Sequence, residues 1–166
     1  MHPALSLAKR KLDDLGAEFG QVLDIEAEVI PRIAGITSPA GTMAKNSLRA
    51  TGIEGVYTGI EGVLKEVLTV VDGGIFAGAE SWHAHLLAQA AEPNQAKGRT
   101  AIISERTYEL LDRLRSFRHL ERNIYRHLLR ERDVEENLER LKLVFPLFEA
   151  EVSSFVTTFR FPEEEA

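Results

Sequence analysis

The chain has 166 residues, 44% of them hydrophobic and 28% charged, and its 20 basic and 26 acidic side chains give a formal net charge of −6. This composition fits a folded globular chain with one good-sized core, and it excludes a disordered one. The absence of cysteine excludes disulfides, a thiol nucleophile and sulfur-bound zinc. No apolar run is long enough to cross a bilayer, and the start lacks the regions of a signal peptide. We therefore expect a cytoplasmic protein that does not engage a membrane.

Helical spacing of apolar residues dominates the chain and predicts four long helices, over residues 4–34, 41–71, 104–129 and 134–159. Pro31 is expected to kink or end the first, and Pro146 to bend the last. A short helix is expected from about Ser81 to the breaker Glu92-Pro93-Asn94. No stretch shows the sustained period-two alternation of a strand. The predicted fold class is all-α, an antiparallel bundle of four long helices with one short extra helix, in a single domain (1–160) before an acidic tail (161–166).

The predicted second helix carries glycines at steps of three, four and three: Gly52, Gly55, Gly59 and Gly62. Each interior glycine costs about 0.5–1 kcal/mol relative to alanine, so this stripe needs a compensating contact. Close packing against another helix, within the bundle or across a dimer, is the favoured interpretation. Gly16 and Gly20 of the first helix are the expected facing positions, and a ligand cleft is the alternative.

The predicted helix over 104–129 concentrates arginine. Between Arg113 and Arg132 there are seven arginines, two histidines and two acids, so 7 − 2 gives a local charge of +5. Such a face suits an anion or an acidic partner, and the alternative is a solvated face paired with Glu and Asp from neighbouring helices. The candidate RNA- or phosphate-binding residues are Arg115, Arg122, Arg126 and His127.

Several kinds of chemistry are excluded by missing motifs. There is no phosphate-binding loop, no dinucleotide fingerprint, no nucleophile elbow and no Glu-x-x-His pair for a di-metal bundle site. His83 and His85 lie two residues apart, so on a helix they face different ways and make a poor chelating pair. No metal and no cofactor are expected. Arginine suits phosphate contacts and histidine suits proton transfer, which together support cleavage of an RNA phosphodiester without a metal.

Four motifs in order give the chain a resemblance to the HepT-like branch of the HEPN superfamily over about residues 5–160. The motifs are Tyr57-Thr58-Gly59-Ile60-Glu61, Asp72-Gly73-Gly74, Trp82-His83-x-x-Leu86-Leu87 and Phe117-Arg118-His119-x-x-Arg122-x-x-Tyr125. The resemblance implies an all-helical, usually homodimeric protein. It also implies a metal-independent ribonuclease toxin whose partner is a small nucleotidyltransferase antitoxin.

The superfamily's catalytic pattern is an arginine followed by four to six residues and a histidine. Aligned on the last motif, the arginine is Arg118, and Asn123 stands where the histidine is expected. A neutral amide cannot exchange a proton as imidazole does. His119 lies one turn before Asn123 on nearly the same face, and we predict that it takes over the proton transfer. The expected catalytic set is therefore Arg118, His119 and Asn123, with Asn123 orienting the scissile group.

Tyr125 keeps its place in the same pattern, two positions after the one expected for histidine. The resemblance implies that the antitoxin transfers AMP to this tyrosine, and the alternative is a packing residue at the edge of the apolar face. Two functions stay open: a ribonuclease toxin, or a catalytically inactive HEPN module that binds a nucleotide or a nucleotidyltransferase partner through the same face.

Overall fold

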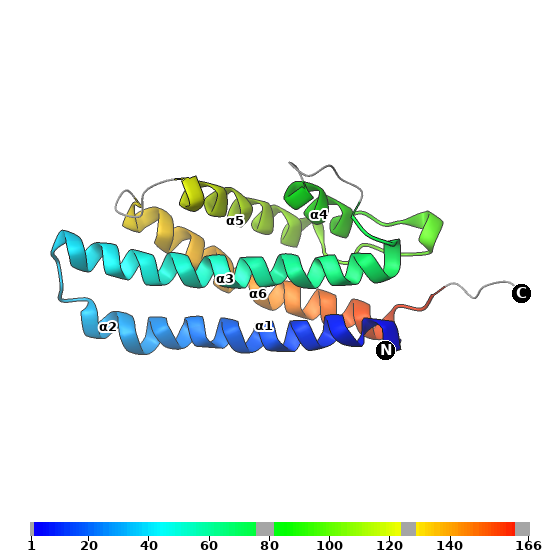
Figure 1. Ribbon diagram of the computed structural model, residues 1–166, viewed down its shortest axis with the longest axis horizontal. Helices are drawn as coiled ribbons and strands as arrows, with labels where there is room; N and C mark the ends of the chain where they lie inside the picture. The colour runs from blue at the N-terminus through cyan, green and yellow to red at the C-terminus, as the bar shows by residue number, and fades with distance from the viewer. Residues whose placement is uncertain (1, 76–81, 124–128, 162–166) are drawn as a thin grey trace, which may run out of the picture.

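The computed structural model describes residues 2–75, 82–123 and 129–161, without the side chains of residues 120–123. Within these ranges the fold is all-α and has no strand, apart from an isolated antiparallel bridge between Asn94 and Arg99. Successive long helices alternate in direction along the molecule, so the predicted antiparallel bundle with a short additional helix is confirmed (Figure 1). The elements are η1 (Pro3–Leu5), α1 (Ser6–Asp24), η2 (Ile25–Val29), α2 (Ile30–Ile33), α3 (Pro39–Asp72), α4 (Trp82–Ala91), η3 (Gln95–Lys97), α5 (Glu105–Asn123) and α6 (Glu131–Thr158).

The first long helix passes through a wide π turn, η2, before it ends at Ile33. Pro31 explains the widening, because it has no N–H to donate and its ring crowds the carbonyl one turn earlier. Ile30 N–H accordingly donates to the carbonyl oxygen of Ile25, five residues back. The proline thus changes the helical geometry, as predicted, without ending the helix at once.

The helix α3 runs through the centre of the fold and has buried residues along its whole length. It begins where the Ser38 hydroxyl accepts from Gly41 N–H at 3.2 Å, with Pro39 in the first turn. It ends because Gly73 adopts a positive φ of 86°, which a residue with a side chain rarely adopts. The predicted stop at Asp72-Gly73-Gly74 is confirmed.

Three glycines of the α3 stripe pack closely against α1 of the same chain. The close packing that the stripe predicted is therefore a contact within the bundle. A Cβ added at Gly52, Gly55 or Gly59 would meet side-chain atoms of α1 at 3.0, 2.6 and 2.3 Å respectively, whereas Gly62 has nothing within 4 Å. The facing residues are Val22, Glu18 and Leu15. The expectation that Gly16 and Gly20 face the stripe is therefore wrong, because the glycines of α3 pack against side chains of α1 and not against its glycines.

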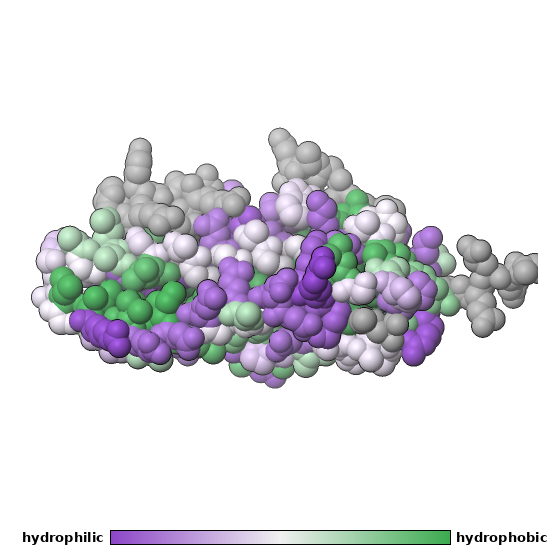
Figure 2. All heavy atoms as spheres, turned by 60° about the horizontal axis from the view of Figure 1, so that its bottom comes forward, coloured by the Kyte–Doolittle hydropathy of each residue, from purple (hydrophilic) through white to green (hydrophobic). Residues whose placement is uncertain are grey.

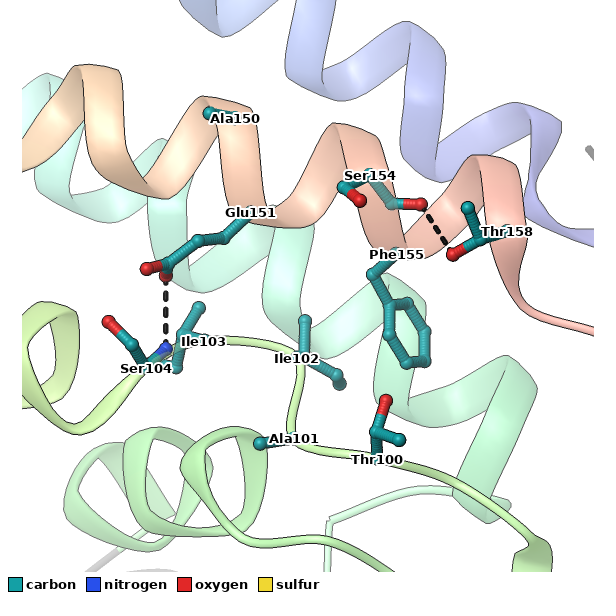
Figure 3. Close-up of a pocket in the computed structure, with 10 residues that line it drawn as sticks. All are labelled: Thr100, Ala101, Ile102, Ile103, Ser104, Ala150, Glu151, Ser154, Phe155 and Thr158. Carbon is teal, nitrogen blue, oxygen red and sulfur yellow. Dashed lines mark hydrogen bonds between the residues drawn. The ribbon is translucent and has the colours of Figure 1, made fainter.

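The long helix predicted over 104–129 is shorter in the structure. α5 spans Glu105–Asn123, and Leu129 lies outside any helix, next to the extended residue Arg130 that precedes α6. At its other end, Ser104 caps α5 by accepting from Thr107 N–H at 3.3 Å. Ser104 N–H donates to the Glu151 carboxylate of α6 at 3.0 Å, in the wall of a hollow of about 510 Å³ (Figure 3). This bond fixes the start of α5 against α6.

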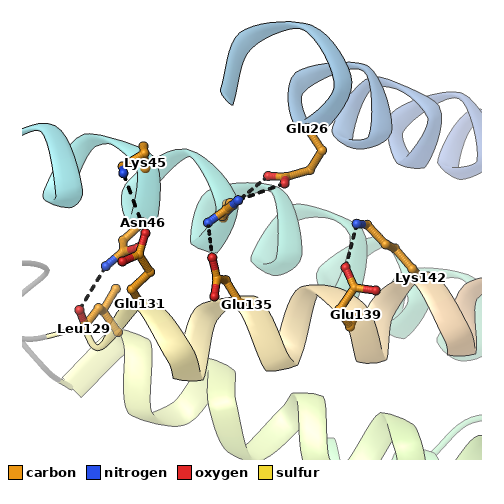
Figure 4. Close-up of polar contacts among 9 residues, drawn as sticks. Glu26, Lys45, Asn46, Leu129, Glu131, Glu135, Glu139 and Lys142 are labelled. Carbon is orange, nitrogen blue, oxygen red and sulfur yellow. Dashed lines mark hydrogen bonds and ion pairs between the residues drawn. The ribbon is translucent and has the colours of Figure 1, made fainter. Parts of the chain in front are cut away.

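Near the N-terminal end of α3, polar side chains connect this helix to η2 on one side and to α6 on the other. Arg49 donates to Glu26 of η2 at 2.9 and 3.2 Å, and to Glu135 of α6 at 3.0 Å (Figure 4). Asn46 donates to the carbonyl oxygen of Leu129 at 3.1 Å. These contacts hold Leu129 and the first turns of α6 against α3.

A buried ion pair anchors the connection between α4 and α5. Arg99 makes two hydrogen bonds of 2.8 Å to the carboxylate of Asp72, and both residues are 3% exposed. Gln89 and Asn94 also donate to this carboxylate, at 2.9 and 3.1 Å. Burial alone would raise the pKa of the Asp72 carboxyl, but these hydrogen bonds outweigh it and lower the pKa below its ordinary value. The carboxylate therefore stays charged and holds α4 in place.

Candidate functional site

A polar cluster lies buried where α3, α4 and α5 meet, centred on Glu61 of α3. Its carboxylate is 3% exposed and accepts two hydrogen bonds. Oε1 accepts from Nδ1 of His83 in α4 at 2.7 Å, and Oε2 accepts from Nη1 of Arg118 in α5 at 2.9 Å. We call Glu61, His83 and Arg118, together with Tyr57, the Glu61 cluster. It joins a carboxylate, an imidazole and a guanidinium from three helices.

The geometry assigns the tautomer of His83. Nδ1 lies 2.7 Å from a carboxylate oxygen and 3.3 Å from Nη1 of Arg118, which is a donor. Since a guanidinium cannot accept a hydrogen bond and a carboxylate cannot donate one, both nitrogens donate to Glu61. Nδ1 therefore carries the proton, and the other ring nitrogen, Nε2, keeps its lone pair when the ring is neutral. The His83 side chain is 31% exposed, so the site reaches solvent on this side.

The arginine of the cluster is held firmly but incompletely satisfied. Arg118 is 8% exposed, and its guanidinium lies 5.7 Å from the ring centre of Tyr57. Arg118 Nε and the Tyr57 hydroxyl have no hydrogen-bond partner among the described residues. Burial, followed by the charge of Glu61, raises the pKa of Tyr57 well above its ordinary value, so its hydroxyl stays protonated. Arg118 Nε is thus a buried donor without a partner in the described structure.

The exposed side of the cluster is flanked by an aromatic ring and a lysine. The ring of Trp82, the first residue of α4, lies 3.8 Å from the ring of His83, centre to centre. Nζ of the exposed residue Lys65 lies 6.0 Å from the centre of the Trp82 ring. Both flanking groups are of kinds that contact nucleic acid, the lysine with phosphate and the tryptophan with bases.

The residues expected to bind or cleave RNA occupy different environments along α5. Arg118 lies in the Glu61 cluster, and His119, the next residue, is exposed. Arg115 is half-buried and donates to Asp112, one turn earlier on the same helix, at 2.8 Å. Arg122 and Asn123 belong to α5, but their side chains are not among those that the structure describes. Tyr125, Arg126 and His127 lie outside the described residues.

The structure joins Arg118 to two residues that the sequence did not mark as functional. Glu61 and His83 were part of the resemblance, and His83 was weighed only as half of a metal pair. A usable signal was present at Glu61, which follows Tyr57 by four residues and precedes Leu64 by three on the core face of α3. A charged residue at a core position requires a partner, and the sequence offers no rule that selects His83 for that role.

Residues 2–75, 82–123 and 129–161 contain no group of three or more histidine, aspartate or glutamate side chains placed to hold a metal ion. They also contain no helix that is both long and apolar enough to span a bilayer.

A separate surface feature lies at the end of the molecule where α2 is followed by α3. Figure 2 shows apolar side chains gathered there. The exposed apolar residues Val29, Ile36, Met43 and Leu48 belong to the segments at this end. A groove of about 600 Å³ between α1 and α3 includes Val22, Ile25 and Leu48 in its wall. This surface contributes no residue to the Glu61 cluster.

Comparison with known families agrees with the helical bundle and with the motifs on α3, α4 and α5. A family model described as HepT-like protein matches residues 49–159, about two thirds of the chain. The protein therefore belongs to the HepT-like family, a HEPN-type group that is in general associated with toxin–antitoxin systems. No match was found among curated proteins or among solved structures. The matched range contains the whole Glu61 cluster.

Proposed function

We propose that this HepT-like protein is a metal-independent ribonuclease that acts as the toxin of a toxin–antitoxin pair. The observation that carries the proposal is the placement of Arg118: its guanidinium is anchored on Glu61, 3.3 Å from an imidazole nitrogen, and its Nε has no partner in the described structure. An arginine held rigidly beside a histidine combines the two groups that phosphodiester cleavage needs when no metal takes part.

The reaction that suits these groups is attack by the ribose 2′-hydroxyl on the adjacent phosphorus. The phosphorane that forms carries more negative charge than the starting diester, and a fixed positive charge stabilises it. In this proposal Arg118 and Arg122 provide that charge, while His119 remains a candidate for proton transfer and Asn123 for orienting the scissile group. Arg115, Arg126 and His127 would contact the RNA backbone along the same helix.

A specific observation favours a second function. Asn123 occupies the position where the family's pattern expects histidine, and an amide does not transfer protons at neutral pH. The second function is a catalytically inactive module that binds a nucleotide or a small nucleotidyltransferase through α5. We propose a homodimer and a nucleotidyltransferase partner under both functions, since the HepT-like family is associated with toxin–antitoxin systems in general.

The experiment that tests the first function is cleavage of single-stranded RNA by purified protein in EDTA. We expect cleavage by wild type and a loss of at least 100-fold in rate for Arg118→Ala, because a fixed charge in a dry site contributes strongly to the transition state. Arg106→Ala is the matched control, since Arg106 is exposed in the first turn of α5, far along the helix from the cluster. Circular dichroism must show that each variant is folded.

Full activity of folded Arg118→Ala would contradict the proposed role of this arginine. Failure of folded wild type to cleave any RNA in EDTA, together with binding of a nucleotide or nucleotidyltransferase, would favour the inactive module.

A further inference from the structure

The ring of His83 is positioned as a general base would be, although it lies on a different helix from the arginine-rich stretch. We propose that His83 is the residue that takes the proton from the 2′-hydroxyl of single-stranded RNA, and that Glu61 is its positioning residue. This inference rests on the proposed ribonuclease function. It replaces His119 as the proton acceptor.

The hydrogen bond from Nδ1 to Glu61 fixes both the tautomer and the direction of the ring. Because Nδ1 carries the proton and points at the buried carboxylate, Nε2 lies on the far side of the ring with its lone pair available. The same bond at 2.7 Å holds the ring in this orientation. An orienting carboxylate behind a histidine is a recurrent arrangement in acid–base catalysis.

Charge balance alone does not require a histidine at this position. The single negative charge of Glu61 already has a full positive partner in Arg118, whose Nη1 lies 2.9 Å from Oε2. His83 is 31% exposed, so it does not fill the core either. The histidine adds a second donor to a carboxylate that is already neutralised, and its ring reaches solvent. This arrangement suits a residue that takes a proton from a bound substrate.

His83, the proposed base, also lies beside Arg118, the proposed stabilising charge. His83 Nδ1 and Arg118 Nη1 are 3.3 Å apart, so a phosphodiester next to the imidazole also lies next to the guanidinium. Lys65, near the Trp82 ring that contacts His83, adds an exposed ammonium for the RNA backbone on this side. His119, by contrast, is exposed on α5.

The proposed step balances as a transesterification. Nε2 of His83 takes the proton of the 2′-hydroxyl, the 2′-oxygen bonds to phosphorus, and the bond from phosphorus to the 5′-oxygen breaks. The departing 5′-oxygen takes a proton from water, and the imidazolium returns its proton to solvent. The products are a 2′,3′-cyclic phosphate end and a 5′-hydroxyl end, so no water, oxidant or metal is consumed.

The decisive variant is His83→Asn. The amide nitrogen of asparagine takes nearly the place of Nδ1, so the hydrogen bond to Glu61 is retained while Nε2 is removed. We expect the rate of RNA cleavage in EDTA to fall 10²- to 10⁴-fold, the usual contribution of a general base. The melting temperature should stay within a few degrees of wild type. His85→Asn, at an exposed position on the same helix, is the matched control and should keep most of the activity. His119→Asn is measured in parallel as the variant of the alternative proton acceptor.

The outcomes separate the inference from the function on which it rests. Wild type that cleaves RNA, with His83→Asn equally active or with activity lost only in His119→Asn, would overturn the role of His83 and leave the ribonuclease standing. A folded wild type that leaves RNA intact would overturn both. If His83→Asn does not fold, His83→Gln provides a second variant with a donor and no imidazole, and activity of folded His83→Gln equal to wild type would overturn the inference.

Discussion

The glycine stripe on α3 gives a prediction whose size follows from the packing. An alanine Cβ at Gly59 would lie 2.3 Å from Leu15 Cδ1 and 3.3 Å from its Cγ, and Leu15 is only 3% exposed. Overpacking of a filled core costs about 1–3 kcal/mol. At Gly62 an added Cβ meets nothing within 4 Å. Both substitutions gain about 0.5–1 kcal/mol of helix propensity, so this gain cancels between them.

Gly59→Ala should therefore be about 1–3 kcal/mol less stable than Gly62→Ala, and Gly62→Ala should be slightly more stable than wild type. At about 2–4 °C per kcal/mol for a chain of this size, the two melting temperatures should differ by roughly 2–12 °C. Thermal unfolding followed by circular dichroism, at one protein concentration, measures the difference. Gly55→Ala is a further control, because its near neighbour is the movable end of the exposed Glu18 side chain. Equal melting temperatures for the Gly59 and Gly62 variants would refute the close packing of α3 on α1.

Three further predictions concern the buried ion pair, the proposed dimer and the proposed modification of Tyr125. Asp72→Asn leaves the Arg99 charge buried without a counter-charge and should cost about 3–5 kcal/mol in urea unfolding. Since the folded pKa of Asp72 lies below its unfolded value, its contribution is present above the unfolded pKa and lost as pH falls through the folded one. The gap between wild type and Asp72→Asn should therefore shrink in acid, and a constant gap would contradict the assignment. Light scattering at micromolar concentration should give the mass of a dimer, and a strict monomer would remove the dimer. Incubation with the cognate nucleotidyltransferase and ATP should add AMP to wild type but not to Tyr125→Phe, and equal labelling of the two would leave Tyr125 as a packing residue.

The helices and the family could be predicted from the sequence because both depend on local patterns. Periodicity located the long helices, and the short motifs pointed to the HepT-like family that the comparison then showed. The positions of the helices relative to one another could be predicted less well from the sequence. The stripe on α3 indicated a close neighbour, but periodicity carries no information on register between helices, so Leu15 and Val22 were not foreseen as the facing residues. The end of the arginine helix was also misplaced, because Leu129 continues the apolar spacing although it lies outside a helix.

The Glu61 cluster illustrates why a site is harder to predict than a helix. The bond from His83 to Glu61 spans 22 residues of sequence, and the bond from Arg118 spans 57. Each of these residues has an ordinary individual interpretation: a polar residue near a core face, one histidine of a poor metal pair, and one arginine among several. Only the packing of α4 and α5 on α3 makes them neighbours. The sequence therefore marked Arg118 as a candidate, while the structure supplied its hydrogen-bond partners.

The most direct measurement of the central claim is the chemistry of the RNA ends after incubation with purified protein in EDTA. Mass spectrometry of the fragments should show 2′,3′-cyclic phosphate and 5′-hydroxyl ends. A substrate with 2′-deoxyribose at the cleaved position should stay intact, because it lacks the attacking hydroxyl. Fragments with 5′-phosphate ends, cleavage that requires added Mg²⁺, or intact RNA after prolonged incubation with folded protein would each contradict metal-independent cleavage at the Glu61 cluster.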